Sequence, residues 1–193
     1  IEEDKKGIYI LNSKDLCLVE YLPELIKAGV DSIKIEGRTK SHYYVAMATK
    51  VYADGLSACA KLKGQKLKAQ LTDLKRELDK IDNRGYTTGF LLGKEGINRQ
   101  NFETSKAVSN WQLVGEVVKA GQSAEIFIHN SLLVGEEVEL ILPLESIKIK
   151  IKEVKDQTGQ KLTEVHGGTK KTYFINLPAN LKSEFGLLRK KIK

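Results

Sequence analysis

The chain has 193 residues, of which 41% are hydrophobic and 30% are charged, a composition typical of globular proteins. It holds no run of about eighteen apolar residues, which excludes a membrane-spanning helix, and its first residues lack the apolar core of a secretory signal. The net charge of +7 is compatible with a polyanionic partner such as nucleic acid, although the surplus is spread along the whole chain.

The first 83 residues alternate short β-branched runs with helical patterns, which indicates βαβ units and parallel strands. Two strands cannot form a stable parallel sheet, so we expect residues 1–83 to be the terminal βα units of a truncated β/α barrel. The missing strands would precede Ile1, where the chain also lacks a starting Met. The predicted elements, in chain order, are a strand over 8–11, a helix from Ser13 or Asp15 to Gly29, a strand over 32–36, and helices over 41–62 and 71–81.

Residues 84–110 show neither the helical nor the strand period and are predicted to form a linker. From Trp111 onward the pattern is that of β-strands separated by turn residues, which predicts a small all-β barrel over residues 111–193. The expected fold is therefore α+β with more than one domain: a partial β/α barrel followed by a β-barrel. The predicted strands of the second domain cover 112–119, 124–129, 137–142, 147–154, 172–175 and 187–192.

Candidate active-site residues follow the two predicted parallel strands, because functional groups of such barrels gather where the strands end. Lys14 and Asp15 follow the first strand, and Glu36 and Arg38 follow the second. An arginine in this position suits a carboxylate or phosphate ligand, and Glu36 could act as a base or hold the guanidinium. A structural ion pair between Glu36 and Arg38 explains the same residues equally well.

A second group of candidates is basic. Lys148, Lys150 and Lys152 alternate with isoleucines, which places three cations on one face of a predicted strand, and Lys170 and Lys171 could extend this row. Such a row could follow the phosphates of RNA, or it could protect the edge of a sheet against pairing with another chain.

The two cysteines, Cys17 and Cys59, form no CxxC pair and have no neighbouring histidine at ligand spacing. Isolated cysteines of this kind are typical of reduced thiols, so the sequence predicts a cytoplasmic protein without a metal site in this chain. The chain also lacks a zinc-protease HExxH, a GxSxG nucleophile motif and a Walker loop.

Four sequence blocks carry a family resemblance that covers nearly the whole chain. They are NSKDL at 12–16, DSIKIEGRTKS at 31–41, RGYTTGF at 84–90 and SNWQLVG at 109–115. In these blocks the chain resembles the collagenase-like peptidase family U32.

This resemblance implies a β/α-barrel-like domain followed by a C-terminal β-barrel. The branch that the chain looks closest to is associated with hydroxylation of the wobble uridine of tRNA, with prephenate as a required metabolite and an iron–sulfur cluster as cofactor. The family's cluster cysteines belong to upstream motifs, so neither cysteine here receives a ligand role and no cofactor is expected in this chain.

The implied partners are tRNA, prephenate and the missing N-terminal domain, and the chain's own contribution would be RNA docking and barrel completion. Two alternatives stay open: a collagenase-like protease of the same family, and a non-catalytic protein-binding module.

Overall fold

The computed structural model describes residues 2–4, 7–9, 13–93, 101, 106–178 and 185–192. The chain divides into two compact units, Ile1–Ser109 and Asn110–Lys193, which are described separately below. Residues 10–12, which complete the predicted first strand and its turn, lie outside the described residues, as do 94–100 and 102–105 of the predicted linker. No helix among the described residues is long and apolar enough to cross a membrane.

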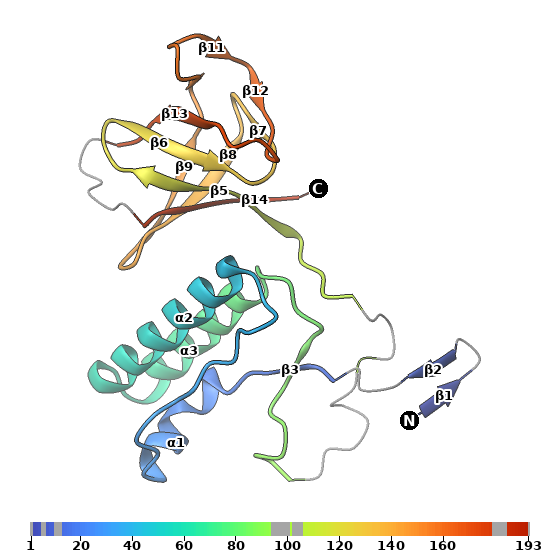
Figure 1. Ribbon diagram of the computed structural model, residues 1–193. Helices are drawn as coiled ribbons and strands as arrows, with labels where there is room; N and C mark the ends of the chain where they lie inside the picture. The colour runs from blue at the N-terminus through green and yellow to red at the C-terminus, as the bar shows by residue number, and fades with distance from the viewer. Residues whose placement is uncertain are drawn as a thin grey trace. The chain divides into compact units, whose positions relative to one another are not determined.

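The described part of the first unit combines three α-helices with short strands (Figure 1). An antiparallel hairpin is followed by a strand that pairs in parallel with a second strand about seventy residues further on. A 3₁₀ turn and all three helices lie between these two parallel strands. The elements are β1 (Glu2–Asp4), β2 (Gly7–Tyr9), β3 (Asp15–Leu16), η1 (Val19–Tyr21), α1 (Leu22–Lys27), α2 (His42–Lys61), α3 (Gly64–Leu78) and β4 (Tyr86–Thr87).

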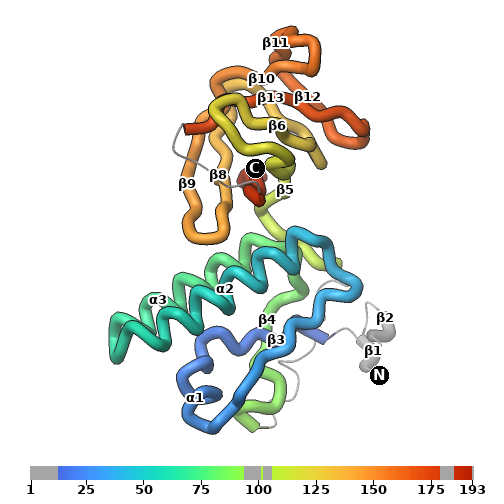
Figure 2. The backbone as a smooth tube through the Cα atoms, turned by 60° about the vertical axis from the view of Figure 1, so that its left-hand side comes forward, coloured from blue at the N-terminus to red at the C-terminus, as the bar shows by residue number. Residues whose placement is uncertain are grey.

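Helices α2 and α3 form an antiparallel hairpin that Figures 1 and 2 show side by side. Helix α2 begins where the sequence predicts, because the Ser41 hydroxyl accepts a hydrogen bond from the backbone N–H of Tyr44 (3.2 Å) and caps the first turn. Gly55 lies where η1 and α1 approach α2: a Cβ atom there would come within 2.6 Å of Leu22 Cδ1. Apolar side chains of η1 and of helices α1, α2 and α3 fill the core, namely Val19, Leu22, Met47, Val51, Leu71, Leu74 and Leu78.

The partial β/α barrel is not confirmed. Segment 32–36 forms no strand in the structure, and Ile8 and Tyr9, at the start of the strand predicted over 8–11, belong to an antiparallel hairpin instead. The isoleucines of 32–36 favour an extended backbone. A β-strand also needs a neighbouring strand to accept its hydrogen bonds, and segment 32–36 has none in the described part of the chain. The parallel pairing occurs instead between β3 and β4, and β4 lies in the segment expected to be a linker.

The second unit is built on one curled antiparallel sheet of eight strands, ordered β11-β10-β13-β6-β5-β14-β8-β9 (Figure 1). The order is open, with β11 and β9 at the two edges, so the all-β domain is a half-barrel rather than a closed barrel. A short pair, β7 with β12, completes it. The strands are β5 (Trp111–Lys119), β6 (Ser123–Ile128), β7 (Leu132–Leu133), β8 (Glu137–Ile141), β9 (Ser146–Lys150), β10 (Val154–Lys155), β11 (Lys161–Leu162), β12 (Glu164–Val165), β13 (Thr172–Asn176) and β14 (Leu187–Lys191).

Alternation along these strands buries one apolar row per strand, including Val114, Ile126, Leu140, Ile175 and Leu188. The buried Arg189 is an exception to the apolar core. Its Nε and Nη2 atoms donate to Glu139 Oε2 (2.9 and 2.6 Å), and its guanidinium lies 5.0 Å from the centre of the Trp111 ring. A buried guanidinium requires such a partner, so this pair ties β14 to β8 in one register.

Candidate functional site

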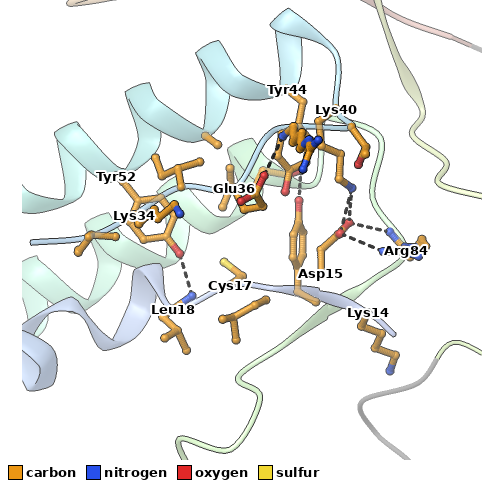
Figure 3. Close-up of a pocket in the computed structure, with 18 of the residues that line it drawn as sticks. Lys14, Asp15, Cys17, Leu18, Lys34, Glu36, Lys40, Tyr44, Tyr52 and Arg84 are labelled. Carbon is orange, nitrogen blue, oxygen red and sulfur yellow. Dashed lines mark hydrogen bonds and ion pairs between the residues drawn. The ribbon is translucent and has the colours of Figure 1, made fainter. Parts of the chain in front are cut away.

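A cavity of about 390 Å³ lies in the first unit, between the β3 segment, the segment 33–40, the first turns of α2 and β4 (Figure 3). Its volume falls in the range of small-molecule sites, about 300–1,000 Å³. All four sequence-predicted active-site residues, Lys14, Asp15, Glu36 and Arg38, line it. Residues from two segments that are separate in the sequence therefore line one pocket.

Asp15 is the electrostatic centre of this pocket. Its carboxylate is only 8% exposed and accepts two hydrogen bonds from Lys40 Nζ, at 2.9 and 3.1 Å. The backbone N–H of Arg84 donates to the same carboxylate (3.2 Å), and the Arg84 guanidinium lies 3.7 Å away. Parallel pairing of β3 with β4 creates this arrangement, since the Asp15 N–H donates to the carbonyl of Gly85 (2.9 Å).

Glu36 and Arg38 lie on the exposed rim of the pocket. Glu36 Oε1 accepts a hydrogen bond from the backbone N–H of Arg38 (3.0 Å), so the carboxylate fixes the turn. No ion pair joins the Arg38 guanidinium to a carboxylate within the described ranges, which leaves it available for a ligand. The side chain of Lys14 packs on Gly85, whose φ of 81° suits a glycine, and Lys14 likewise makes no described ion pair.

Sequence reasoning missed Lys40 and Arg84. Lys40 stands two residues after Arg38 in the same loop, so its position could have suggested it. Arg84 could not be found in this way, because only the β3–β4 pairing brings residue 84 to residue 15.

Three tyrosines line the pocket wall. The Tyr52 hydroxyl accepts a hydrogen bond from the Leu18 N–H (2.8 Å), and the Tyr86 hydroxyl donates to the Leu78 carbonyl (2.6 Å). Burial raises the pKa of Tyr52 to about 12, and burial also raises the pKa of Tyr86 and of Tyr44, the latter with help from the Asp15 charge. These phenols therefore stay protonated at neutral pH and can donate hydrogen bonds.

The charge balance of the pocket favours an anion. Five cationic side chains line it against two carboxylates, Asp15 and Glu36, and the cations are Lys14, Lys34, Arg38, Lys40 and Arg84. Burial raises the pKa of the Cys17 thiol beside Tyr52, so this cysteine is a protonated thiol, unlike a catalytic thiolate. The arrangement can bind and orient a small acid or a phosphate, with charge-assisted hydrogen bonds from Lys and Arg.

The two cysteines do not fit an iron–sulfur cluster. Cys17 is buried in the pocket wall and Cys59 lies near the end of α2. Neither belongs to a group of three possible metal ligands within 4.8 Å of one another in the part of the chain that the structure describes. A cluster requires several thiolates, and no reaction step can be assigned to one here.

The predicted RNA-binding lysines lie in the second unit. Lys148 and Lys150 of β9 and Lys152 just after it are all exposed, as the alternation predicts, at the edge of the sheet. Carboxylates accompany them: Lys148 lies 3.8 Å from Glu137 and opposite Glu139 on β8. Lys170 and Lys171 are exposed just before β13, and four strands separate β13 from β9 in the sheet, so the sheet does not place them in one row.

Comparison with known proteins extends over both units. The model of Peptidase family U32 matches residues 1–101, and that of the Peptidase family U32 C-terminal domain matches residues 109–189. The tRNA hydroxylation protein P of Haemophilus influenzae is 34% identical over 98% of this chain, and that of Escherichia coli is 34% identical over 96%. The chain spans 41% and 40% of the length of these two relatives.

Two further similarities are more distant. A protein named Collagenase from Porphyromonas gingivalis is 24% identical over 84% of this chain and 42% of its own length. The C-terminal domain of a putative U32 peptidase from Geobacillus thermoleovorans, a solved structure, matches 41% of this chain and 99% of its own with a TM-score of 0.37 and 20% identity. With family models matched over residues 1–101 and 109–189, the chain belongs to peptidase family U32.

Proposed function

We propose that this chain is part of a protein that hydroxylates the wobble uridine of tRNA. The observation that carries the proposal is the 34% identity to two tRNA hydroxylation proteins over at least 96% of the chain. The relative named Collagenase shares only 24% identity over a shorter part. Such an enzyme would act in the cytoplasm, where its tRNA substrate is found.

The pocket of the first unit would bind prephenate. Prephenate carries two carboxylates, and the excess of cationic side chains in the pocket favours a dianion. Arg38 and Lys14 have no described ion pair, so they would contact the ligand directly. Asp15 would hold Lys40 and Arg84 in place, and Glu36 would fix the backbone from which Arg38 extends.

The remainder of such a protein would supply the cofactor. An iron–sulfur cluster provides electron-transfer chemistry when it is bound, and we propose that its ligands belong to an N-terminal domain. That domain would also cover apolar surface of the first unit, where Leu16, in the two-stranded β3–β4 sheet, is 62% exposed and Ile33 is 38% exposed. Its strands would complete the sheet that β3 and β4 begin.

The second unit would contribute to RNA docking through Lys148, Lys150 and Lys152, with Lys170 and Lys171 as separate contacts. Glu137 and Glu139 beside the row reduce its positive potential, so each lysine would add only a modest share of the affinity.

A collagenase-like protease is the second candidate, favoured only by the names of some relatives. Among the described lining residues the sole thiol, that of Cys17, has a raised pKa, which opposes a role as nucleophile. A protein-binding module without catalysis is the third candidate, and the cationic pocket gives no support for it.

A chimera tests the proposed function. The region of the Escherichia coli tRNA hydroxylation protein P that this chain matches is replaced by this chain, and the chimera is expressed in a strain that lacks its own tRNA hydroxylation activity. We expect mass spectrometry of the tRNA to show hydroxylated wobble uridine, whereas the protein with that region deleted restores none. A folded, abundant chimera that restores no hydroxylation, or that degrades gelatin instead, would contradict the proposal.

A further inference from the structure

The turn between α2 and α3 carries a cluster of lysines that none of the sites above includes. Lys61, Lys63, Lys66 and Lys68 all have exposed side chains. The sequence contains no aspartate or glutamate from residue 55 to residue 72, so the local charge of this stretch is +4. We name these four residues the turn lysines.

Other cations on the same helices are compensated. Lys50 pairs with Asp54 (3.1 Å), Lys75 pairs with Glu20 (3.0 Å) and Arg76 pairs with Asp73 (2.8 Å). None of the turn lysines makes an ion pair with any carboxylate that the structure describes. Burial raises the pKa of the Cys59 thiol, and the charge of Glu24 on α1 raises it further, yet Glu24 makes no described ion pair with these lysines. The helical hairpin is thus charge-balanced along its length and uncompensated at its tip.

Helix stability does not explain this pattern. A lysine at the end of a helix is favourable, which accounts for Lys61 at the end of α2. Lys63 and Lys66 flank the start of α3, where positive charge opposes the helix dipole, and the first turn of α3 contains no acidic residue. Helix stability therefore does not account for Lys63 and Lys66, whereas contact with an anionic partner would.

The position of the cluster suits an extended ligand. The turn lies at the end of the hairpin away from β3 and β4 in both views (Figures 1 and 2). Seventeen residues of α2 separate Tyr44 in the pocket from Lys61, a distance of about 26 Å at 1.5 Å per residue. Neither of the two cavities described for the first unit is lined by a turn lysine, so the cluster forms an open surface rather than an enclosed small-anion site.

The hairpin holds this surface firmly. The Leu62 N–H donates to the Ala58 carbonyl (2.7 Å) at the end of α2, and Leu62 and Leu67 are half-buried against the hairpin. Lysine ammonium groups on a fixed scaffold neutralise phosphates as point charges without reading base sequence.

We infer that the turn lysines bind the phosphate backbone of the RNA on which the protein acts, a contact that rests on the proposed tRNA function. Because the four turn lysines are uncompensated and the row on β9 is partly compensated by Glu137 and Glu139, this turn provides more of the electrostatic affinity than Lys148, Lys150 and Lys152 do. The contact is independent of sequence and positions the RNA along α2, with the pocket near the opposite end of the helix.

The test measures tRNA binding by the 193-residue chain at several salt concentrations. The turn variant changes Lys61, Lys63, Lys66 and Lys68 to Gln, which has a helix propensity close to that of Lys. A matched control removes the same net charge elsewhere, through Lys27→Gln, Lys119→Gln, Lys155→Gln and Lys161→Gln. Circular dichroism confirms that both variants keep the fold.

Each neutralised phosphate contributes about 0.7–0.9 to the slope of log affinity against log salt, so the turn variant should lose roughly 3 from that slope. Between 50 and 200 mM salt, the unmodified chain should then lose about 50- to 150-fold more affinity than the turn variant. The matched control should keep a slope close to that of the unmodified chain.

Three results would overturn the inference: equal slopes for the turn variant and the matched control, no tRNA binding by the unmodified chain at 50 mM salt, or binding to phosphatidylserine vesicles without binding to tRNA. The chimera experiment remains separate. If the chimera restores hydroxylation but the turn lysines do not affect tRNA binding, the proposed function is supported and only the inferred RNA contact of the turn lysines is rejected.

Discussion

Replacing Asp15 by Asn should loosen the first unit and leave the second unchanged. Asn has nearly the shape of Asp but brings an NH₂ donor toward Lys40 Nζ and the Arg84 N–H, both of which donate to the present carboxylate. Hydrogen bonds to charged groups contribute about 1.5–3 kcal/mol each. The Lys40 side chain is 21% exposed, so water compensates part of the loss, and we expect a net cost of about 2 kcal/mol.

The assay exploits the distribution of chromophores. All described α-helices lie in the first unit, whereas the single tryptophan, Trp111, lies in the second. In urea, with a slope of roughly 1.5 kcal/mol/M for a unit of this size, the transition followed by circular dichroism at 222 nm should move down by about 1.3 M. The transition followed by Trp111 fluorescence should stay in place.

Asp73→Asn is the matched control, because it removes the same charge from a solvated ion pair with Arg76 on α3. Asp73 is 64% exposed, so its loss should change the stability by less than about 0.5 kcal/mol. Equal midpoints for Asp15→Asn and Asp73→Asn would refute the view that Asp15 organises the pocket.

Three further predictions concern the first unit. Folding raises the pKa of Tyr52 from about 10 to about 12, so the folded state keeps a proton that the unfolded state releases, and the resulting stability is complete below pH 10 and lost as the pH rises toward 12. Urea midpoints measured at pH 8, 10 and 11 should therefore decline more steeply for the native chain than for Tyr52→Phe. Gly55→Ala should destabilise the helices by about 1–3 kcal/mol in the same assay, since the new methyl group meets Leu22, and an unchanged midpoint would show that the Leu22 side chain moves aside freely. Arg38→Ala should weaken prephenate binding in calorimetry by tenfold or more and leave the free energy of unfolding within about 0.5 kcal/mol of the native value, because the exposed guanidinium makes no described ion pair. A loss of stability without a loss of binding would show that Arg38 has a structural role.

Features of the fold that depend on residues close in sequence could be predicted from the sequence. The serine before an apolar helical pattern placed the start of α2 at Ser41, and strict alternation exposed Lys148, Lys150 and Lys152 while turning Ile151 inward. Helix α3 begins at Gly64, seven residues before the predicted start, because its first turns are polar and show little of the apolar period.

Long-range pairing could not be predicted in the same way. Ile33 and Ile35 have the β-propensity of a strand, yet segment 32–36 has no strand neighbour in the structure. The residues around Asp15 were identified as a candidate site from their position alone, while the partner Arg84 depends on β4, which consists of only two residues and carries no periodic signal. The buried Arg189 was likewise unexpected, because only the pairing of β14 with β8 supplies Glu139.

The β3–β4 pairing also sets the order in which the first unit can form. The hydrogen bond between the Arg84 N–H and Asp15 closes a loop of 69 residues, whereas contacts across the α2–α3 hairpin close shorter loops. Long loops close late, because their entropy must be lost before any distant contact forms. A newly made chain would therefore carry its helical hairpin, with the turn lysines already in place, before the anion pocket exists. An anion that binds only the fully formed pocket should lower the unfolding rate of the first unit and leave its folding rate unchanged.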